Sequence, residues 1–290
     1  MSVPKLHHYV PIFYLNRFLD DTNRFWVFDK KTKRTFQTNP NSVASETHFY
    51  RVPEFIGTKQ DPLFLERQFS GIESVVAQTT EQWLVDLENI QPMDKLNISD
   101  ENRKQISFYI SLQFLRTAEQ RDILSLFAEE YGGYKSGVSS EEKINLHATM
   151  LCKEGLVDDI ASRVYDSIWI FARNTTETPF FTSDNPVCFK TSDNKMWLKA
   201  KGILSIGTYA VFPLSPSMVL YCKERSYWKK LEGFDCSLSP VEFTSEMVDH
   251  ENSGQIFMAS RFVISPINDF DFARDFLDSI GTDKYSPDGR

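Results

Sequence analysis

Residues 99–131 read SDENRKQISFYISLQFLRTAEQRDILSLFAEEY, and this stretch decides the fold. Ser99 supplies a hydroxyl that can cap a helix, and the acidic Asp100 and Glu101 suit the positive end of the helix dipole. The apolar side chains that follow lie nearly all round the helix, which is typical of a buried central element. The diglycine at 132–133 ends the pattern. We therefore expect one long central helix over 99–131.

Helical periodicity continues on both sides of this stretch. Apolar residues recur at three- and four-residue steps after Asp61-Pro62, which predicts a long amphipathic helix there. Further helices are expected at 140–153, from about 157, at 245–260 and at 272–277.

Short runs rich in β-branched and aromatic residues dominate after Ser167, separated by turn residues. The strands predicted from these runs are 168–172, 179–182, 209–214, 218–222 and 262–264. Of these, 209–214 and 218–222 should form an antiparallel hairpin. Near the N-terminus, two strands at 25–28 and 34–37 flank a polar turn, and a third is predicted at 48–52.

Strands and helices are segregated along the chain rather than alternated, which favours an α+β fold over a doubly wound parallel sheet. We expect central long helices packed with a mostly antiparallel sheet that is formed largely by the C-terminal half. Residues 1–290 are predicted to form a single domain. Its parts are an N-terminal motif and β-hairpin (1–60), a helical core (61–165), a β-rich portion with a returning helix (166–265), and a C-terminal helix and tail (266–290).

The composition is that of a globular protein, because 41% of the 290 residues are hydrophobic and 14% are aromatic. No apolar run reaches the roughly 20 residues that span a bilayer, and residues 1–5 lack the pattern of a secretion signal. The four cysteines fit no metal-binding spacing and are too few to cross-link a chain of this length. We expect a cytoplasmic protein with reduced thiols and no membrane association.

The net charge of −8 bears on possible partners. Proteins dedicated to nucleic acids usually carry a basic face, so the acidic balance counts against such a module but leaves open a nuclease with a local basic groove. The chain has no Walker loop, Gly-x-Gly-x-x-Gly, His-Glu-x-x-His, zinc-finger spacing or kinase motif set. The common classes of nucleotide-dependent enzyme are therefore excluded.

Three segments together resemble one family. They are HHYVPIFYLNRF at 7–18, QFLRT at 113–117, and TSDNP at 182–186 followed by FPLSP at 212–216. They are similar to the motifs of a family of mostly bacterial proteins known only as a domain of unknown function, although Ala118 stands where that family commonly has proline. The resemblance covers roughly residues 7 to 265 and supplies no catalytic assignment. Through some members of that family, the resemblance also implies an association with bacterial conflict or phage-defence systems.

His8 and two glutamates are the first candidate site residues. His8 lies between aromatic residues before a proline, where it could act as a general base or a metal ligand. The alternative is a packed histidine that anchors the N-terminus, and His7 is expected to face solvent. Glu66 and Glu73, seven residues apart on the first long helix, project on nearly the same side and could act as acid and base or share a metal. A solvated helix edge is the alternative for this pair.

Gln113 and Arg116 occupy apolar positions of the central helix, where burial without partners would cost several kcal/mol. They are expected either to join a buried network, with Asp184 or Glu73 as the partner, or to hold an anionic substrate. Glu119 and Arg121 are expected to be ordinary surface charges.

Asp184 and Asn185 lie in a turn after an apolar strand, the usual place for a site. Asp184 could bind a metal or orient His8, and Asn185 could position a substrate. A purely structural turn is the alternative, because both residue types bond their own backbone before proline.

Two functional hypotheses follow. The first is a metal-assisted, nuclease-like hydrolase in bacterial phage defence, with His8, Glu73 and Asp184 as catalytic residues. Its substrate-binding residues are Gln113, Arg116 and Asn185, its cofactor is a divalent metal, and its partner is a nucleic acid or a small polar substrate. The second is a non-catalytic sensor or interaction module, in which the same polar residues form a buried structural network. The hydrolase hypothesis requires His8, Glu73 and Asp184 to meet in one cleft.

Overall fold

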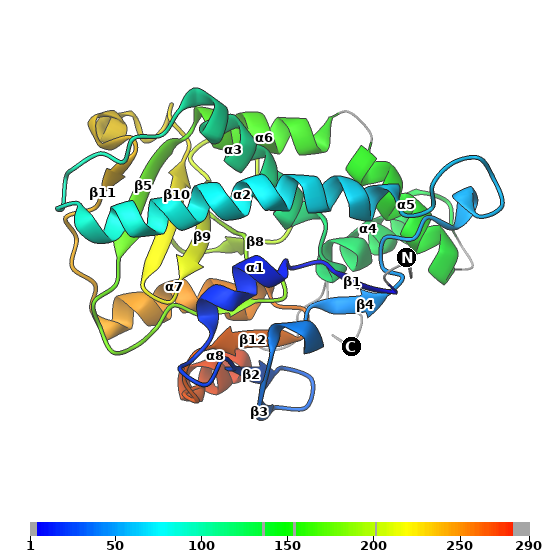
Figure 1. Cartoon of the computed structure of the whole chain (residues 1–290), viewed down its shortest axis with the longest axis horizontal. Coiled ribbons are helices and arrows are strands. Elements are labelled where there is room, and N and C mark those ends of the chain that lie inside the picture. The colour runs from blue at the N-terminus through cyan, green and yellow to red at the C-terminus, as the bar shows by residue number, and fades with distance from the viewer. Residues whose placement is uncertain (1–4, 135–136, 153–154, 201, 281–290) are drawn as a thin grey trace.

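A computed structural model describes residues 5–134, 137–152, 155–200 and 202–280. Over these ranges the fold is α+β, as predicted, with long helices beside a mostly antiparallel sheet that comes from the C-terminal half (Figure 1). The helices are α1 (Ile12–Leu15), α2 (Phe64–Asn89), α3 (Asp100–Leu115), α4 (Ala118–Tyr131), α5 (Ser140–Cys152), α6 (Leu156–Asp166), α7 (Ser245–Met258) and α8 (Asp271–Ile280), with short 3-10 turns η1 (Asn16–Phe18), η2 (Pro40–Ser42), η3 (Pro53–Phe55) and η4 (Lys229–Phe234). The strands are β1 (Leu6–His8), β2 (Phe25–Asp29), β3 (Arg34–Thr38), β4 (Ser45–Thr47), β5 (Ile168–Arg173), β6 (Thr182–Ser183), β7 (Cys188–Lys190), β8 (Trp197–Leu198), β9 (Tyr209–Ser215), β10 (Met218–Lys223), β11 (Ser237–Leu238) and β12 (Phe262–Ser265).

The larger sheet has six strands in the order β11-β5-β10-β9-β7-β8. Its pairings are antiparallel except for β11 with β5, which is parallel. β9 and β10 form the predicted hairpin, and its register places Lys223 directly opposite Tyr209.

Strand β5 shows why this sheet has two different faces. Successive side chains of a strand point to opposite faces, so Trp169 and Phe171 lie on one face and Ile170 and Ala172 on the other. Trp83 of α2 packs edge-on against Trp169 and Phe171, with ring centroids 6.0 Å apart in both pairs. The helical layer therefore covers the Trp169 face.

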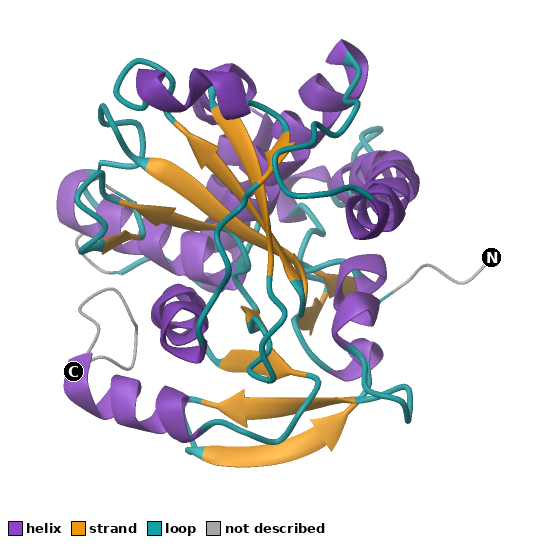
Figure 2. Cartoon of the chain, turned by 90° about the vertical axis from the view of Figure 1, so that its left-hand side faces the viewer, coloured by secondary structure: helices purple, strands orange, loops and turns teal. Residues whose placement is uncertain are grey.

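The smaller sheet joins the two ends of the chain. Its order is β3-β2-β12-β6, so the predicted N-terminal hairpin β2–β3 pairs with a strand that follows α7. Figure 2 shows this sheet beneath the larger one. Helix α7 contacts β6 of the smaller sheet and β7 and β8 of the larger one. Separately, β1 pairs with β4 in a two-stranded ribbon that fastens the N-terminal motif.

The predicted single helix over 99–131 is wrong, because the chain forms two helices that break at Arg116–Thr117. Ser99 caps α3 as predicted, accepting a hydrogen bond from the backbone of Asn102. Arg116 leaves the helical region (φ −85°, ψ 2°) and Thr117 is extended (φ −80°, ψ 164°). The hydroxyl of Tyr50 donates to the carbonyl oxygen of Arg116 at 2.9 Å, so a side chain takes the place of the next helical turn.

Two predicted strands differ in the structure. The strand expected at 48–52 is wrong, because β4 ends at Thr47 and His48 has a positive φ of 60° that an extended strand does not allow. The strand expected at 179–182 is reduced to β6, because the backbone N–H groups of Phe180 and Phe181 donate to the Pro216 carbonyl and the Asn252 side chain instead. Lys153, the predicted end of the third helix, lies outside the described residues, as does the tail from 281.

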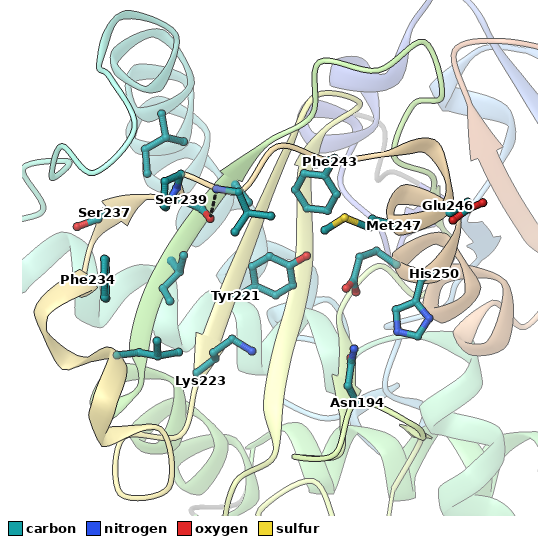
Figure 3. Close-up of a pocket in the computed structure, with 17 residues that line it drawn as sticks. Asn194, Tyr221, Lys223, Phe234, Ser237, Ser239, Phe243, Glu246, Met247 and His250 are labelled. Atoms are coloured by element: carbon teal, nitrogen blue, oxygen red, sulfur yellow. Dashed lines mark hydrogen bonds between the residues drawn. The ribbon is translucent and has the colours of Figure 1, made fainter.

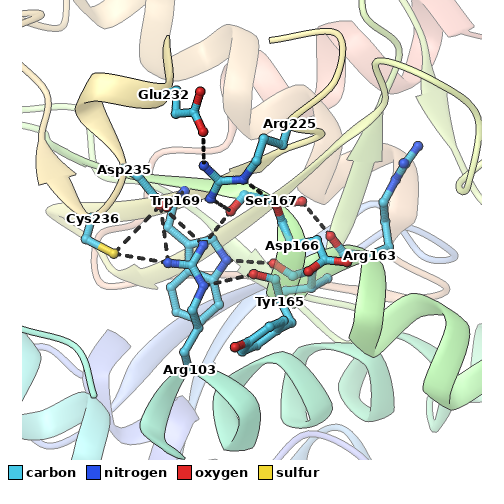
Figure 4. A network of polar contacts seen from close by, with 11 residues as sticks. Arg103, Arg163, Tyr165, Asp166, Ser167, Trp169, Arg225, Glu232, Asp235 and Cys236 are labelled. Atoms are coloured by element: carbon cyan, nitrogen blue, oxygen red, sulfur yellow. Dashed lines mark hydrogen bonds and ion pairs between the residues drawn. The ribbon is translucent and has the colours of Figure 1, made fainter. Parts of the chain in front are cut away.

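A charged network fixes the segment between η4 and β11 to the edge of the larger sheet (Figure 4). The carboxylate of Asp235 accepts hydrogen bonds from the backbone N–H of Trp169 at 2.9 Å, from Arg225 at 2.6 Å and from Arg103 at 3.2 Å. Arg103 also donates to the backbone carbonyls of Tyr165 and Ser167. Charge-assisted bonds of this kind are the strong ones, so the segment is held in one position.

Two further predictions, the lack of a membrane-spanning segment and the reduced cysteines, came from the composition. In the described part of the chain, no helix combines the length and the apolar character needed to cross a membrane. All four cysteines are free thiols, as expected.

Candidate functional site

The first candidate site is a cavity of about 410 Å³ between the N-terminal motif and α2, here called the N-terminal cleft. The motif reaches this place because β1 pairs with β4 and Pro11 then starts α1. His8 and Phe13 line one wall, and Glu66, Phe69 and Glu73 of α2 line the other. The structure thus brings His8 and Glu73 together, as the hydrolase hypothesis requires.

A buried network supports this cleft from below. The guanidinium of Arg116, with no exposed surface, donates through Nη1 to Glu73 at 2.7 Å and through Nε to Gln113 at 3.0 Å and to the Tyr9 carbonyl oxygen at 3.2 Å. The side-chain amide of Gln113 donates to the same carbonyl at 2.9 Å. Of the two partners predicted for Arg116, Glu73 is correct. The network holds the backbone of the motif and positions the Glu73 carboxylate at the cleft.

Glu66 is the residue with the most altered acidity in the cleft. Burial and, to a lesser extent, the negative charge of Glu73 raise its pKa to about 7, against the opposing effect of Arg116. The carboxyl group makes no hydrogen bond or ion pair with the residues that the structure describes. Near neutral pH, Glu66 is therefore protonated in about half of the molecules.

Three buried polar atoms around Glu73 have no hydrogen-bond partner among the described residues. They are Nε2 of His8, Nη2 of Arg116 and the hydroxyl oxygen of Tyr109. Burial lowers the pKa of His8, against the opposing effect of the Asn41 and Pro40 backbone, so its imidazole is mainly neutral at pH 7. An unpartnered buried polar atom costs about 1–3 kcal/mol, so this cluster is unfavourable for the folded protein alone.

Asp184 does not join His8 and Glu73, so the predicted meeting of these three residues is wrong. Its carboxylate oxygens accept three backbone hydrogen bonds, from Ser260 at 2.9 Å, Arg261 at 2.8 Å and Phe262 at 3.0 Å. The side chain is buried and is not part of the N-terminal cleft. Asp184 therefore fixes the turn that starts β12, which is the structural alternative.

Asn185 also does not line the N-terminal cleft and is fully buried. Its backbone N–H donates to the Ser183 hydroxyl at 3.1 Å. Neither polar atom of its side chain has a partner among the described residues. Asn185 lines none of the cavities described here, so the structure gives no support to its predicted substrate-binding role.

Three residues predicted to face solvent are buried instead. His7 has no exposed surface, and its Nδ1 accepts a hydrogen bond from the Tyr50 backbone at 2.9 Å. Glu119 pairs with Lys199 at 2.6 Å. Arg121 donates to the side chain of His147, and the burial of that imidazole lowers its pKa to about 3.

A second cavity, of about 550 Å³, was missed by the sequence reasoning. This sheet pocket lies on the face of the larger sheet that carries Ile170 and Ala172, opposite the helical layer, and α7 forms its other side (Figure 3). Lys223 and Tyr221 of β10 project into it beside Glu251 of α7. Lys223 could have indicated this pocket from the sequence. It follows Tyr221 by two residues on a largely apolar strand, so both side chains point to the same face of the sheet.

Across the described ranges, no group of three or more His, Cys, Asp or Glu residues could hold a metal ion.

The comparisons with known proteins give a family and no function. The family model described as "Protein of unknown function (DUF4238)" matches residues 6–269. No curated protein and no solved structure matches the chain.

Proposed function

The chain belongs to the DUF4238 family of proteins of unknown function, and within it we propose that this protein is a hydrolase that performs acid–base chemistry in the N-terminal cleft. The observation that carries the proposal is a pair of carboxyl groups in different environments. Glu66 has a pKa of about 7, whereas Glu73 is the ion-pair partner of the buried Arg116. Two acids separated in this way are the usual basis of acid–base assignments.

Each residue of the cleft then has a role. Protonated Glu66 donates a proton to the leaving group, since a group with a pKa near the working pH transfers protons efficiently. The Glu73 carboxylate, oriented by Arg116, accepts a proton from the attacking water. Neutral His8 offers a second acceptor or a hydrogen bond to substrate. The apolar rings of Phe13 and Phe69 limit access of bulk water.

The substrate class follows from the size and polarity of this site. A cavity of about 410 Å³ suits a small molecule or one segment of a larger one. His8, Glu66 and Glu73 line the cleft with hydrogen-bond donors and acceptors. We therefore propose a polar substrate with both donor and acceptor groups.

The narrower proposal, a metal-assisted nuclease in phage defence, uses the same cleft. Glu66 and Glu73 supply two oxygen-bearing side chains, and Mg²⁺ commonly binds one or two carboxylates together with substrate phosphates. A nucleic-acid substrate would thus have to complete the metal site. The acidic net charge of −8 does not favour this version.

The second candidate function is a non-catalytic interaction module, and the bonds to Tyr9 favour it. Gln113 and Arg116 both donate to the Tyr9 carbonyl, so they serve the fold whether or not a reaction takes place. Glu66 separates the two functions, because it lies outside this network.

The experiment is a hydrolysis screen of the full chain and of Glu66→Gln at several pH values from 5 to 8. Chromogenic esters, phosphomonoesters and glycosides are tested beside DNA and RNA, each with EDTA or with Mg²⁺ or Mn²⁺. We expect turnover that falls as pH rises through about 7 and that is lost in Glu66→Gln. Glu88→Gln, an exposed change on the same helix, should behave as wild type. Equal turnover by Glu66→Gln and wild type, or no turnover of any substrate, would reject the hydrolase and leave the interaction module.

A further inference from the structure

The sheet pocket contains a lysine in an unusual environment. The Lys223 ammonium lies 3.6 Å from the ring centroid of Tyr209, 4.3 Å from that of Trp228 and 5.5 Å from that of Tyr221. Among the described residues it has no hydrogen-bond acceptor and no ion-pair partner. Aromatic faces attract a cation but provide no negative charge, so Lys223 can accept an anion.

The nearby charges leave Lys223 as the cation available to a ligand. Glu251 is paired with Lys190 at 3.5 Å, and Lys190 also contacts His250 at 2.8 Å. Burial, with a smaller contribution from Lys190, lowers the pKa of Lys223 to about 8, against the opposing effect of Glu251. At pH 7 the side chain is therefore still mainly an ammonium ion.

The part of the pocket away from Lys223 is apolar, and the Asp235 network fixes one of its edges. Ile170, Leu238, Val241 and Phe243 line it. Leu238 belongs to β11, which follows the segment that the Asp235 network ties to the sheet edge (Figure 4). A pocket with a formed apolar wall and a few polar groups at one end is the usual form of a small-molecule site.

We propose that the sheet pocket binds a small amphipathic carboxylate, with the head group at Lys223 and the apolar body against Ile170 and Val241. Figure 3 shows Lys223 in the lower part of the pocket, with Tyr221 above it. A singly charged head is favoured over a phosphate dianion, because Glu246 and Glu251 line the same pocket and repel a second negative charge. The site is separate from the N-terminal cleft and does not depend on the hydrolase proposal.

Isothermal titration calorimetry of the full chain at pH 7 tests this inference. Octanoate and indole-3-propionate represent an aliphatic and an aromatic source of the carboxylate, and 1-octanol is the uncharged analogue. Lys223→Met keeps the apolar stem within the aromatic rings and removes the charge. Lys59→Met, at an exposed position, is the matched control. Val241→Asp places a charge on the apolar wall at a residue that is 52% exposed in wild type, so the fold should tolerate it.

We expect at least one carboxylate to bind wild type and Lys59→Met equally, and to bind Lys223→Met about tenfold more weakly or worse, since a charged hydrogen bond is lost. Val241→Asp should weaken the same carboxylate. Binding of octanoate alone assigns an aliphatic ligand, and binding of indole-3-propionate alone assigns an aromatic one. Failure of both carboxylates to bind, unchanged affinity in Lys223→Met, or 1-octanol binding as tightly as octanoate would overturn the proposal. Urea unfolding of each variant shows that it is folded.

Discussion

Replacing Glu66 with glutamine should make the protein more stable, and increasingly so as pH rises. The pKa of Glu66 is about 7 in the folded protein and 4.5 when unperturbed. A group whose folded pKa is raised contributes stability that is fully present below its unfolded pKa and is lost as pH rises through the folded one. For these two values the loss between pH 5 and pH 8 is about 2.5 kcal/mol. Solvent screening of a half-buried side chain reduces this to about 2 kcal/mol.

The assay is urea unfolding of wild type, Glu66→Gln and Glu88→Gln at pH 5 and pH 8, at the same ionic strength. Other groups titrate over this range, so the measured quantity is the difference between wild type and Glu66→Gln at each pH. We expect this difference to grow by about 2 kcal/mol from pH 5 to pH 8 in favour of the variant. Glu88→Gln should follow wild type, because that side chain is exposed. If Glu66→Gln also runs parallel to wild type, Glu66 is not protonated near neutral pH and its role as the acid is refuted.

Three further predictions concern buried polar groups. The pKa of His147 is lowered to about 3, so the stability it contributes is present above pH 6.5 and lost as pH falls; between pH 7 and pH 5 the loss is about 2 kcal/mol. In urea unfolding at both pH values, His147→Gln should lack this loss, because glutamine can still accept from Arg121 and donate to Leu115 without titrating. Arg116→Met should lower the free energy of unfolding by about 3 kcal/mol, since it leaves Glu73 without its ion-pair partner; a loss under 1 kcal/mol in the same assay would contradict the network. Asp184→Asn should cost about 2 kcal/mol, seen as a lower melting temperature, because an amide N–H₂ would face backbone N–H groups of Ser260–Phe262.

Local patterns predicted the elements, because periodicity and capping depend on neighbouring residues. The cap at Ser99, the hairpin of β9 and β10 and the apolar stripe of α2 are of this kind. The break at Arg116 could not be found in this way, because the carbonyl oxygen of Arg116 bonds the Tyr50 hydroxyl, 66 residues away in sequence. The same holds for Glu119, whose partner Lys199 is 80 residues away.

The candidate site was predictable only where local patterns revealed it, and not where the partners are distant in sequence. Gln113 and Arg116 stood out because polar side chains at apolar helix positions require partners, and Glu73 was one of the two expected for Arg116. Asp184 was assigned wrongly, since nothing in its sequence neighbourhood shows that the backbone of 260–262 takes up its carboxylate. Lys223 was not singled out, because the sheet pocket exists only once α7 packs beside the larger sheet.

The structural network and the proposed reaction are not true alternatives, because the same bonds serve both. By holding the Tyr9 carbonyl, Gln113 and Arg116 place His8 in the wall of the N-terminal cleft, and Arg116 also fixes Glu73. Loss of activity in an Arg116 variant would therefore say nothing about chemistry. Glu66 is different: its carboxyl group is half-buried, has no hydrogen-bond partner in the described ranges, and destabilises the fold at neutral pH. Glu66 thus destabilises the fold and takes no part in the hydrogen-bond network, so fold stability does not account for its position. Its pKa of about 7 supports the proposed role in acid–base chemistry.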